Sequence, residues 1–279
     1  MGKPNIIYED NDIIVCYKPA GMATQTRRIG QQDMESFIRN YRAAKNEPPY
    51  VGIVHRLDQP VEGVMVFAKN QKAAASLSRQ IKEHTTEKYY YAASYGLGSR
   101  DDFKTIGNTV CMDRKLSIAE KADDNSENSE KSSLGMKIHT LTDYISFDKR
   151  TNTSKITTAK DPQAKKAVLE YEVVEQKNNI TAFNIKLLTG RHHQIRLQFA
   201  NIGYPLIGDT KYGGERTANN SIAKAAATSG SVRTGRSRGT SREQLALCSY
   251  KIVIDHPVSG KRMAFEVKPQ NSILKSVIN

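Results

Sequence analysis

The chain has 279 residues and a formal net charge of +13, because its 42 lysine and arginine residues outnumber 29 acidic ones. No apolar run approaches the ~18 residues that cross a bilayer, and the N-terminal stretch MGKPNIIYEDND lacks the apolar segment of a secretory signal. These features argue against a membrane-spanning or secreted protein, and we expect a soluble cytoplasmic one.

The net charge and the spacing of the cysteines indicate the kind of partner and the redox state of the thiols. A strong positive charge is typical of proteins that bind a polyanion, most often nucleic acid, and a soluble basic protein without such a partner is the alternative. Cys16, Cys111 and Cys248 lie far apart and form no CxxC pair. An odd, sparse set of this kind predicts reduced thiols rather than a disulfide framework.

A strand, a turn and a helix are predicted at the start of the chain. Residues 13–17 form an apolar run that predicts a strand, and the Lys-Pro-Ala-Gly sequence at 18–21 is a turn signal. Residues 33–44 have helical spacing, and Asp33 is a suitable N-cap.

The apolar run at 51–54 predicts a buried strand that ends abruptly in His-Arg-Leu-Asp. Arg56 and Asp58 then lie at a strand end, and loops carried by a rigid scaffold often hold functional groups. A surface ion pair between Arg56 and Asp58 is the simpler alternative, since exposed pairs are common and weak.

The next elements are a strand at 64–68, an amphipathic helix at 71–84 and a strand at 89–95. Because side chains alternate along a strand, Tyr90 shares a face with small residues. This face has room for a planar guest beside the tyrosine ring, although a tyrosine packed under a loop fits the pattern equally well.

The remaining elements mix strands and helices without strict alternation, which predicts an α+β fold. We expect a single catalytic domain over 1–279, with a mixed, mostly antiparallel sheet flanked by helices and loops. Further strands are predicted at 169–174, 180–188, 247–254 and 262–267.

Two polar segments interrupt this pattern. Residues 120–131 are mainly acidic, and residues 216–242 are basic and rich in Gly, Ser, Thr and Ala. Neither can bury enough apolar surface to offset the entropy of ordering, so both are predicted to be flexible loops. The basic one could contact phosphates, or it could be a tolerated surface insertion.

A second polar cluster lies at 189–196, with the sequence TGRHHQIR, and an apolar helical pattern follows it. Arg196 should therefore lie in the first turn of a helix after a tight turn at Gly190. An arginine there can hold a carboxylate in its ionised form through charge-assisted hydrogen bonds. Asp58 is the carboxylate that we expect it to hold.

The sequence offers little support for a metal or a nucleotide cofactor. His55, His192 and His193 lack the spacing of a zinc site. There is no GxGxxG and no GxxxxGK[ST] motif. We therefore predict that the protein uses no cofactor.

Five motifs occur in order along the chain: IIYEDNDIIVCYKPAGM, HRLDxxxxG, KYYYAASYG, TGRHHQIRLQFANIGYPLIGDTKYGG and HPVSG. Together they resemble the motifs of the RluA-type RNA pseudouridine synthases over residues 6 to about 268. The resemblance implies the pseudouridine synthase fold and an isomerase that converts specific uridines in structured rRNA or tRNA. The expected partner is this RNA, bound by a monomer.

The same resemblance implies roles for four residues. Asp58 corresponds to the catalytic aspartate, Tyr90 to the tyrosine that stacks on the target base, and Arg196 to the basic partner of the aspartate. Arg56 corresponds to the arginine that enters the helical stack when the target nucleotide flips out, which offsets part of the cost of unstacking.

The reaction breaks the N1–C1′ bond, turns the uracil and joins C5 to C1′, so it needs no redox cofactor. An ionised aspartate can attack the ribose, or it can act as a base in a glycal route, and the sequence leaves both open.

Several positions depart from the family pattern. Val61-Glu62 replaces the usual Thr-Ser, and we expect Glu62 to point away from Asp58 or to pair with a lysine or arginine, because an unpaired neighbouring charge would raise the pKa of Asp58. His192, Leu169 and Cys248 also replace usual residues. The chain starts at the first family strand, so we expect no S4-like RNA-binding domain.

Two other functions compete with this prediction. A non-catalytic RNA-binding protein on the same fold is disfavoured by the intact Asp58, Tyr90 and Arg196. A nucleosidase or glycosidase would usually need a second catalytic carboxylate, for which Glu62 is the near candidate.

Overall fold

A twelve-stranded sheet forms the framework of the computed structural model, which describes residues 4–26, 28, 30–96, 110–115, 137–213 and 243–278. The two polar segments predicted as loops, 120–131 and 216–242, lie outside the described residues. The strands are β1 (Asn5–Glu9), β2 (Ile13–Lys18), β3 (Gly52–Ile53), β4 (Glu62–Ala68), β5 (Glu87–Tyr95), β6 (Val110–Lys115), β7 (Lys137–Asp148), β8 (Thr153–Thr157), β9 (Lys165–Lys177), β10 (Ile180–Leu187), β11 (Leu247–Asp255) and β12 (Arg262–Glu266). The helices are α1 (Met34–Ala44), α2 (Gln71–Lys82), α3 (Gln194–Asn201) and α5 (Ser272–Val277).

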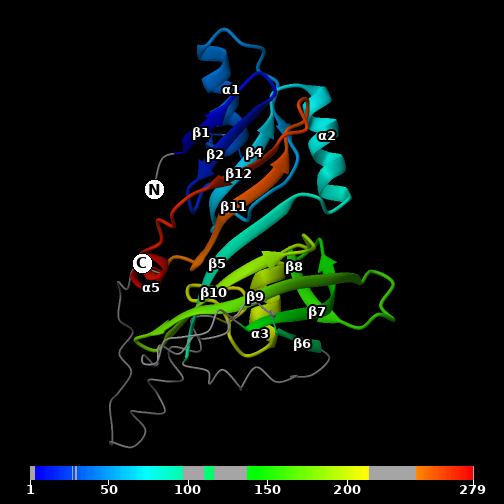
Figure 1. Cartoon of the computed structure of the whole chain (residues 1–279), viewed down its shortest axis with the longest axis vertical. Coiled ribbons are helices and arrows are strands. Elements are labelled where there is room, and N and C mark those ends of the chain that lie inside the picture. Colours follow the sequence, from blue (N-terminus) through cyan, green and yellow to red (C-terminus); the bar gives the residue numbers. More distant parts are fainter. Residues whose placement is uncertain are drawn as a thin grey trace, which may run out of the picture.

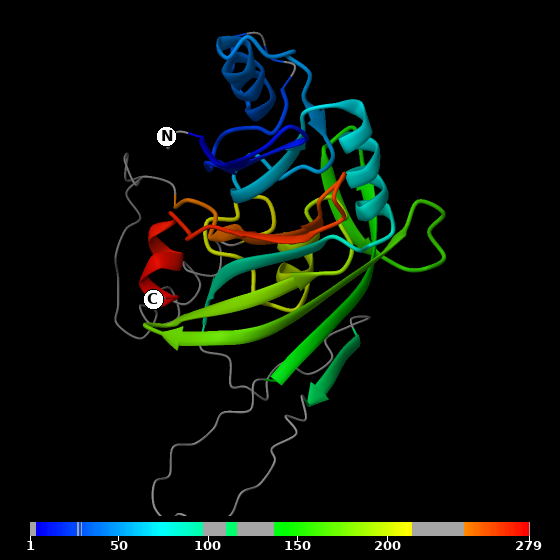
Figure 2. The same cartoon turned by 45° about the horizontal axis from the view of Figure 1, so that its top comes forward.

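The strand order is β1-β2-β4-β11-β5-β10-β9-β7-β6, with β3, β8 and β12 added beside β4, β7 and β11. Among the described strands, β4 and β11 form the one parallel pair, and the other pairs are antiparallel. Figures 1 and 2 show the twisted sheet, with α1 and α2 at the N-terminal end and α3 against the β7–β8 end. This mixed, mostly antiparallel sheet confirms the predicted α+β class.

The two faces of β2 and β4 pack against different helices, because side chains alternate along a strand. On one face, Cys16 and Phe67 join a core cluster that includes Ile38 of α1. On the other face, Val15 and Val66 pack with α2. Both faces are therefore buried, which explains why β2 and β4 read as continuous apolar runs.

The sequence specifies where the first two helices begin. Asp33 caps α1 by accepting a hydrogen bond from the Ser36 backbone N–H, and the Ser36 hydroxyl accepts one from the Asp33 N–H in return. Asn70 caps α2 by accepting from the Ala73 backbone N–H at 2.8 Å. The predicted starts of both helices are confirmed.

None of the helices in the described parts of the chain is long and apolar enough to cross a membrane.

The predicted strand at 51–54 is shorter than expected, because β3 contains only Gly52 and Ile53. The next backbone donor along β4, the N–H of Val66, bonds the Nε2 atom of His55 at 3.0 Å. The histidine side chain thus takes the place of a strand carbonyl, and the chain leaves the sheet toward Asp58.

An acidic side chain ties β1 to α1 and to the end of β4. Glu9 lies 2.8 Å from the Lys45 Nζ and 2.7 Å from the Lys69 Nζ, and it accepts a hydrogen bond from Tyr41 at 2.7 Å. Burial alone would raise the pKa of Glu9, but these partners lower it from 4.5 to about 2. Its ionised form therefore stabilises the folded chain.

We predict that Glu9→Gln reduces the loss of stability in acid. The folded-state pKa lies below the unfolded one, so the Glu9 contribution is complete above pH 4.5 and is lost as the pH falls toward about 2. Chemical denaturation at pH 2–7 should show a flatter fall in unfolding free energy for Glu9→Gln. Glu266→Gln, which changes a side chain that is 57% exposed, is the control and should follow the unmodified chain. An unchanged slope for Glu9→Gln would contradict the prediction.

Candidate active site

A cavity of about 570 Å³ lies beside Asp58, between the loop after β3, strand β5 and the start of α3. The structure brings all four residues singled out by the sequence into its lining. These are Arg56, Asp58, Tyr90 and Arg196. Asp58 and Arg196 are 138 positions apart in the sequence, and the fold brings them together at this cavity.

Two buried polar side chains, Lys18 and Thr24, bond the backbone of the loop that carries Asp58. The Lys18 ammonium donates to the Gln59 carbonyl at 3.2 Å and to the carbonyls of Pro19 and Met22. The Thr24 hydroxyl bonds both the N–H and the carbonyl of Leu57. These contacts fix the backbone on both sides of Asp58.

Arg196 joins two carboxylates. Its Nη1 lies 3.3 Å from the Oδ2 of Asp58, while its Nε and Nη2 bond the two oxygens of Asp209 at 2.8 and 2.7 Å. Asp209 is buried, and its Oδ1 also accepts the backbone N–H groups of Lys211 and Tyr212. Burial favours a raised pKa for Asp209, but the hydrogen bonds and charge of Arg196 outweigh it and lower the pKa. The expected Asp58–Arg196 contact is present, and Asp209 is the closer partner that the sequence analysis missed.

A histidine is the second neighbour of Asp58. His193 Nε2 lies 3.5 Å from the same Oδ2 that Arg196 faces, and His193 Nδ1 lies 2.8 Å from the Tyr212 hydroxyl. Among the described residues, the Oδ1 of Asp58 has no hydrogen-bond partner. The Asp58 side chain is 28% exposed and lines the cavity.

Tyr90 forms part of the cavity wall from β5. It is 6% exposed, and Ala92 on the same face of the strand is fully buried. Burial raises the pKa of Tyr90, so the phenol stays protonated. The ring is held in place and can offer a flat apolar surface to a guest.

Arg56 is exposed at the cavity. The ion-pair partners of Asp58 in the described chain are Arg196 and His193, not Arg56. The surface ion pair considered for Arg56 and Asp58 is therefore not formed, and the guanidinium is available to a ligand.

Glu62 points away from Asp58, as expected, but it does not pair with a lysine or arginine. It is 1% exposed, and it accepts hydrogen bonds from the Tyr17 hydroxyl and from the backbone N–H groups of Gln270 and Asn271. The sequence departure at this position thus anchors the chain just before α5. Glu62 does not line the Asp58 cavity, which removes the second carboxylate that a glycosidase would need.

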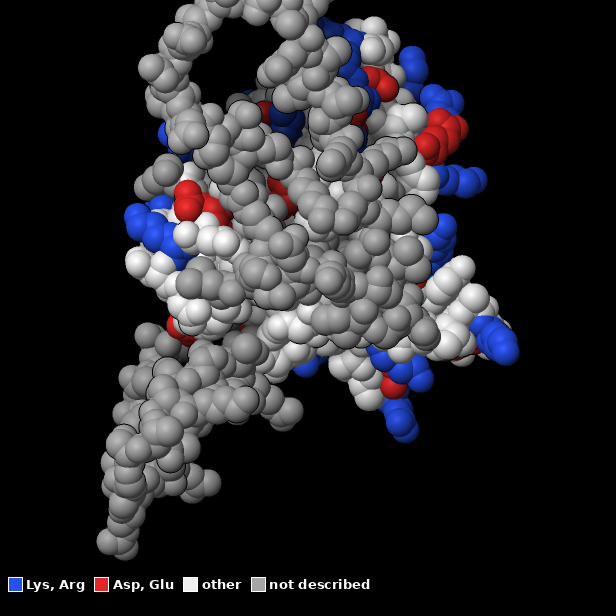
Figure 3. Space-filling model, turned by 60° about the horizontal axis from the view of Figure 1, so that its bottom comes forward, with Lys and Arg blue, Asp and Glu red and all other residues white. Residues whose placement is uncertain are grey.

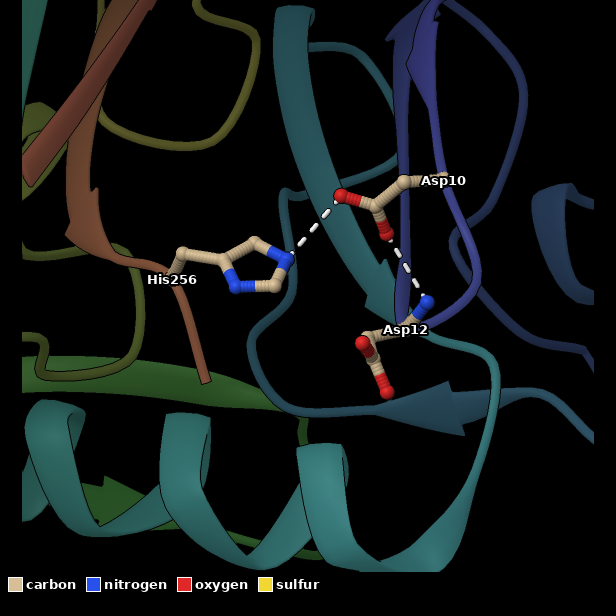
Figure 4. A group of neighbouring side chains, drawn as sticks. All are labelled: Asp10, Asp12 and His256. Atoms are coloured by element: carbon tan, nitrogen blue, oxygen red, sulfur yellow. Dashed lines mark hydrogen bonds and ion pairs between the residues drawn. The ribbon is translucent and has the colours of Figure 1, made fainter. Parts of the chain in front are cut away.

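One group in the described chain brings histidine and carboxylate atoms close enough to share a metal ion: Asp10, Asp12 and His256. Figure 4 shows His256 reaching Asp10 from the turn after β11, with Nε2 and Oδ2 3.0 Å apart. The His256 Nδ1 accepts the Ser259 backbone N–H at 3.1 Å, which leaves Nε2 as the nitrogen that donates to Asp10. These hydrogen bonds connect two turns. Both ring nitrogens of His256 are engaged in them, so neither is directed at a metal position.

Comparison with known proteins adds independent information. The family model for RNA pseudouridylate synthase matches residues 12–201. The chain is 30% identical over 275 residues to an uncharacterized RNA pseudouridine synthase of Aquifex aeolicus, covering 95% of this chain and 69% of that protein. It is 31% identical over 212 residues to a ribosomal large subunit pseudouridine synthase D of Haemophilus influenzae, covering 75% of this chain and 53% of that protein.

Solved structures show the same fold. The human RNA pseudouridylate synthase domain containing 1 aligns with a TM-score of 0.61 at 19% identity, covering 96% of this chain and 84% of that one. The human RNA pseudouridylate synthase domain containing 4 aligns with a TM-score of 0.58 at 16% identity, covering 97% and 90%.

We predict that Asp209→Ala strongly destabilises the chain. Among the described residues it leaves the buried Arg196 guanidinium with one carboxylate, Asp58 at 3.3 Å, beside its stacking on the Tyr212 ring, and breaking a buried pair by removing one partner costs about 3–5 kcal/mol. Urea denaturation measures the loss. Glu266→Ala removes an exposed carboxylate that pairs with Lys251 and should cost less than about 1 kcal/mol. Equal losses for the two variants would contradict a structural role for the Arg196–Asp209 pair.

Proposed function

The chain belongs to the RNA pseudouridylate synthase family, whose members are isomerases, and from this premise we propose that it converts specific uridines in structured RNA to pseudouridine. The observation that carries the proposal is the Asp58 carboxylate in the cavity wall, whose Oδ2 lies 3.3 Å from Arg196 and 3.5 Å from His193, while Oδ1 has no hydrogen-bond partner among the described residues. Ribosomal RNA is the proposed substrate rather than tRNA, because the relative in Haemophilus influenzae is named for the large ribosomal subunit.

The proposed reaction uses the residue types in the cavity. In the nucleophilic route Asp58 attacks C1′ of the ribose, so that an ester bond forms and the N1–C1′ bond breaks; in the glycal route Asp58 removes the C2′ proton while the same bond breaks. Uracil turns against the ring of Tyr90 and its C5 joins C1′, which breaks the ester bond to Asp58 or, in the glycal route, returns the proton to C2′. The C5 proton then leaves and N1 takes up a proton, so the product is an isomer of the substrate. No electron is transferred to or from an outside group, in accord with the prediction that no cofactor is used.

Base flipping is the proposed role of Arg56. A base inside a helical stack cannot reach the Asp58 cavity, and extruding it costs a few kcal/mol. Arg56 is exposed beside the cavity and has no acidic partner among the described residues. Its planar guanidinium can fill the space that the flipped nucleotide leaves.

The charge of the cavity suits an anionic substrate. The cations of the lining are Arg56, Lys82, Lys88, Arg191 and Arg196, and among the described residues that line it Asp58 is the one acidic residue. Figure 3 shows further lysine and arginine side chains projecting around the edge of one face of the molecule.

The protein is proposed to act in the cytoplasm, as a monomer.

Lys88 is the most informative of these cations. It lies on the same face of β5 as Tyr90, burial lowers its pKa, and it has no hydrogen bond or ion pair among the described residues. Partial burial removes some of the water around a cation, and contact with an anionic ligand would offset the free-energy cost of that loss. A phosphate of the bound RNA is the proposed partner.

We predict that Asp58→Asn abolishes the reaction and leaves RNA binding intact. The neutral amide keeps the shape of the carboxylate but is neither a nucleophile nor a base, so the rate should fall by about 10³-fold or more. RNA labelled with [5-³H]uridine, taken from cells that lack the gene, releases tritium to water when C5 loses its proton. Asp148→Asn, at an exposed site outside the cavity, is the control. Tritium release by Asp58→Asn at the normal rate would overturn the mechanism.

We also predict that Lys88→Met makes RNA binding less sensitive to salt. A plot of log affinity against log salt concentration should lose about 0.7–0.9 of its slope if one phosphate contact disappears. Filter binding of the same RNA between low and moderate salt measures the slope. Lys72→Met removes an exposed lysine of α2 that does not line the cavity, and it should leave the slope unchanged. An identical slope for Lys88→Met and the unmodified chain would contradict the phosphate contact.

A further inference from the structure

We propose that His193 is a positioning residue for the reaction: it directs an N–H group at Asp58, and Tyr212 fixes the tautomer in which it can do so. The inference rests on the proposed function, because it concerns how the Asp58 carboxylate is presented to uridine. It adds a second donor to the one that Arg196 supplies.

The hydrogen bonds of Tyr212 determine the tautomer. The Tyr212 hydroxyl accepts the backbone N–H of Ser154 at 3.1 Å and lies 2.8 Å from the His193 Nδ1. Among the described residues the hydroxyl has no third partner, so its single proton has one acceptor, the His193 Nδ1. A neutral imidazole that accepts at Nδ1 carries its own proton on Nε2. This is the nitrogen that lies 3.5 Å from Asp58 Oδ2.

The surroundings keep the imidazole neutral. His193 is 9% exposed, and burial lowers its pKa to about 4 against the opposing effect of Asp58. The other charged and titratable groups that face the ring are Arg196, His192, Lys211 and Tyr212. At neutral pH the ring therefore has one N–H, and the tautomer decides whether that N–H meets Asp58.

The backbone at His193 indicates that its side chain is held there for this contact. His193 is the N-cap of α3 and has a φ of 54°, a left-handed conformation that favours glycine or asparagine. Its side chain caps no backbone N–H of the helix, whereas Asp33, Asn70 and Asn271 each cap theirs. The side chain is not used as a cap, and its contacts are with Tyr212 and Asp58.

Both donors approach the same carboxylate oxygen. Arg196 Nη1 and His193 Nε2 lie 3.3 and 3.5 Å from Oδ2 of Asp58. Such contacts can be long in the unliganded site and tighten when substrate binds. Together they set the rotation of the carboxylate, so that Oδ1 faces the cavity, where C1′ of the uridine would lie.

Two substitutions at His193 distinguish the contribution of Nδ1 from that of Nε2. His193→Asn tolerates the left-handed backbone and keeps a polar atom near the position of Nδ1, but it has none near Nε2. His193→Gln reaches the position of Nε2 with an amide N–H. In the tritium-release assay, His193→Asn should lower kcat about 10- to 100-fold, the cost of a misplaced reacting group, while KM and RNA affinity stay unchanged. His193→Gln should recover most of the lost rate.

The tautomer is tested by adding Tyr212→Phe to each background. With His193 present, Tyr212→Phe should lower kcat, because nothing then fixes the proton on Nε2. In the His193→Gln background it should have no further effect on kcat, since an amide has no tautomer to fix. A plot of kcat against pH for the unmodified protein should show no inflection near pH 6.5, where an ordinary histidine titrates.

Additive effects of Tyr212→Phe in the two backgrounds, or equal losses for His193→Asn and His193→Gln, would overturn the inference. So would an unchanged kcat for His193→Asn or an inflection near pH 6.5 that disappears in His193→Gln. If the unmodified protein releases no tritium, the proposed function itself fails and the inference with it. Normal release together with additive effects would overturn the inference alone.

Discussion

The buried pair of Arg196 and Asp209 is the interaction on which the candidate active site depends. A buried ion pair offsets its desolvation cost only when the geometry is good and the remaining polar atoms are satisfied. Here both Asp209 oxygens bond the guanidinium, and two backbone N–H groups complete the carboxylate. With two of its nitrogens occupied in this way, Arg196 has its third directed at Asp58. The position of the Asp58 carboxylate thus depends on a second carboxylate, Asp209, which does not line the cavity.

The opposite side of Asp58 is held by the sheet and its turns. Lys18, fully buried at the end of β2, joins the turn after that strand to the Gln59 carbonyl. Glu62, at the start of β4, bonds Tyr17 and the chain before α5. The loop with Asp58 therefore lies between two fixed boundaries, and its own backbone has little freedom to move. Rigidity of this kind lets a surface loop hold a reacting group in one orientation.

Much of the fold could be predicted from the sequence, because β2 and β4 are continuous apolar runs and both early helices have apolar residues at helical spacing. Strand β7 could not, since its buried face alternates His139 and Asp143 with Leu141 and Ile145, and two polar residues hide the pattern. For the site, Asp58 and Arg196 stood out by motif. Asp209 and Tyr212 did not, because a carboxylate and a phenol in a turn carry no signal until the fold places them beside Arg196 and His193.

We propose that Asp58, held by this frame, isomerises uridine within RNA. A map of pseudouridines tests this directly, in the total RNA of cells that carry either the unmodified gene or the Asp58→Asn allele at the same expression level. We expect one or a few uridines in structured RNA, foremost ribosomal RNA, to lose their modification completely in the Asp58→Asn cells while the rest of the map is unchanged. Identical maps in the two strains would contradict it.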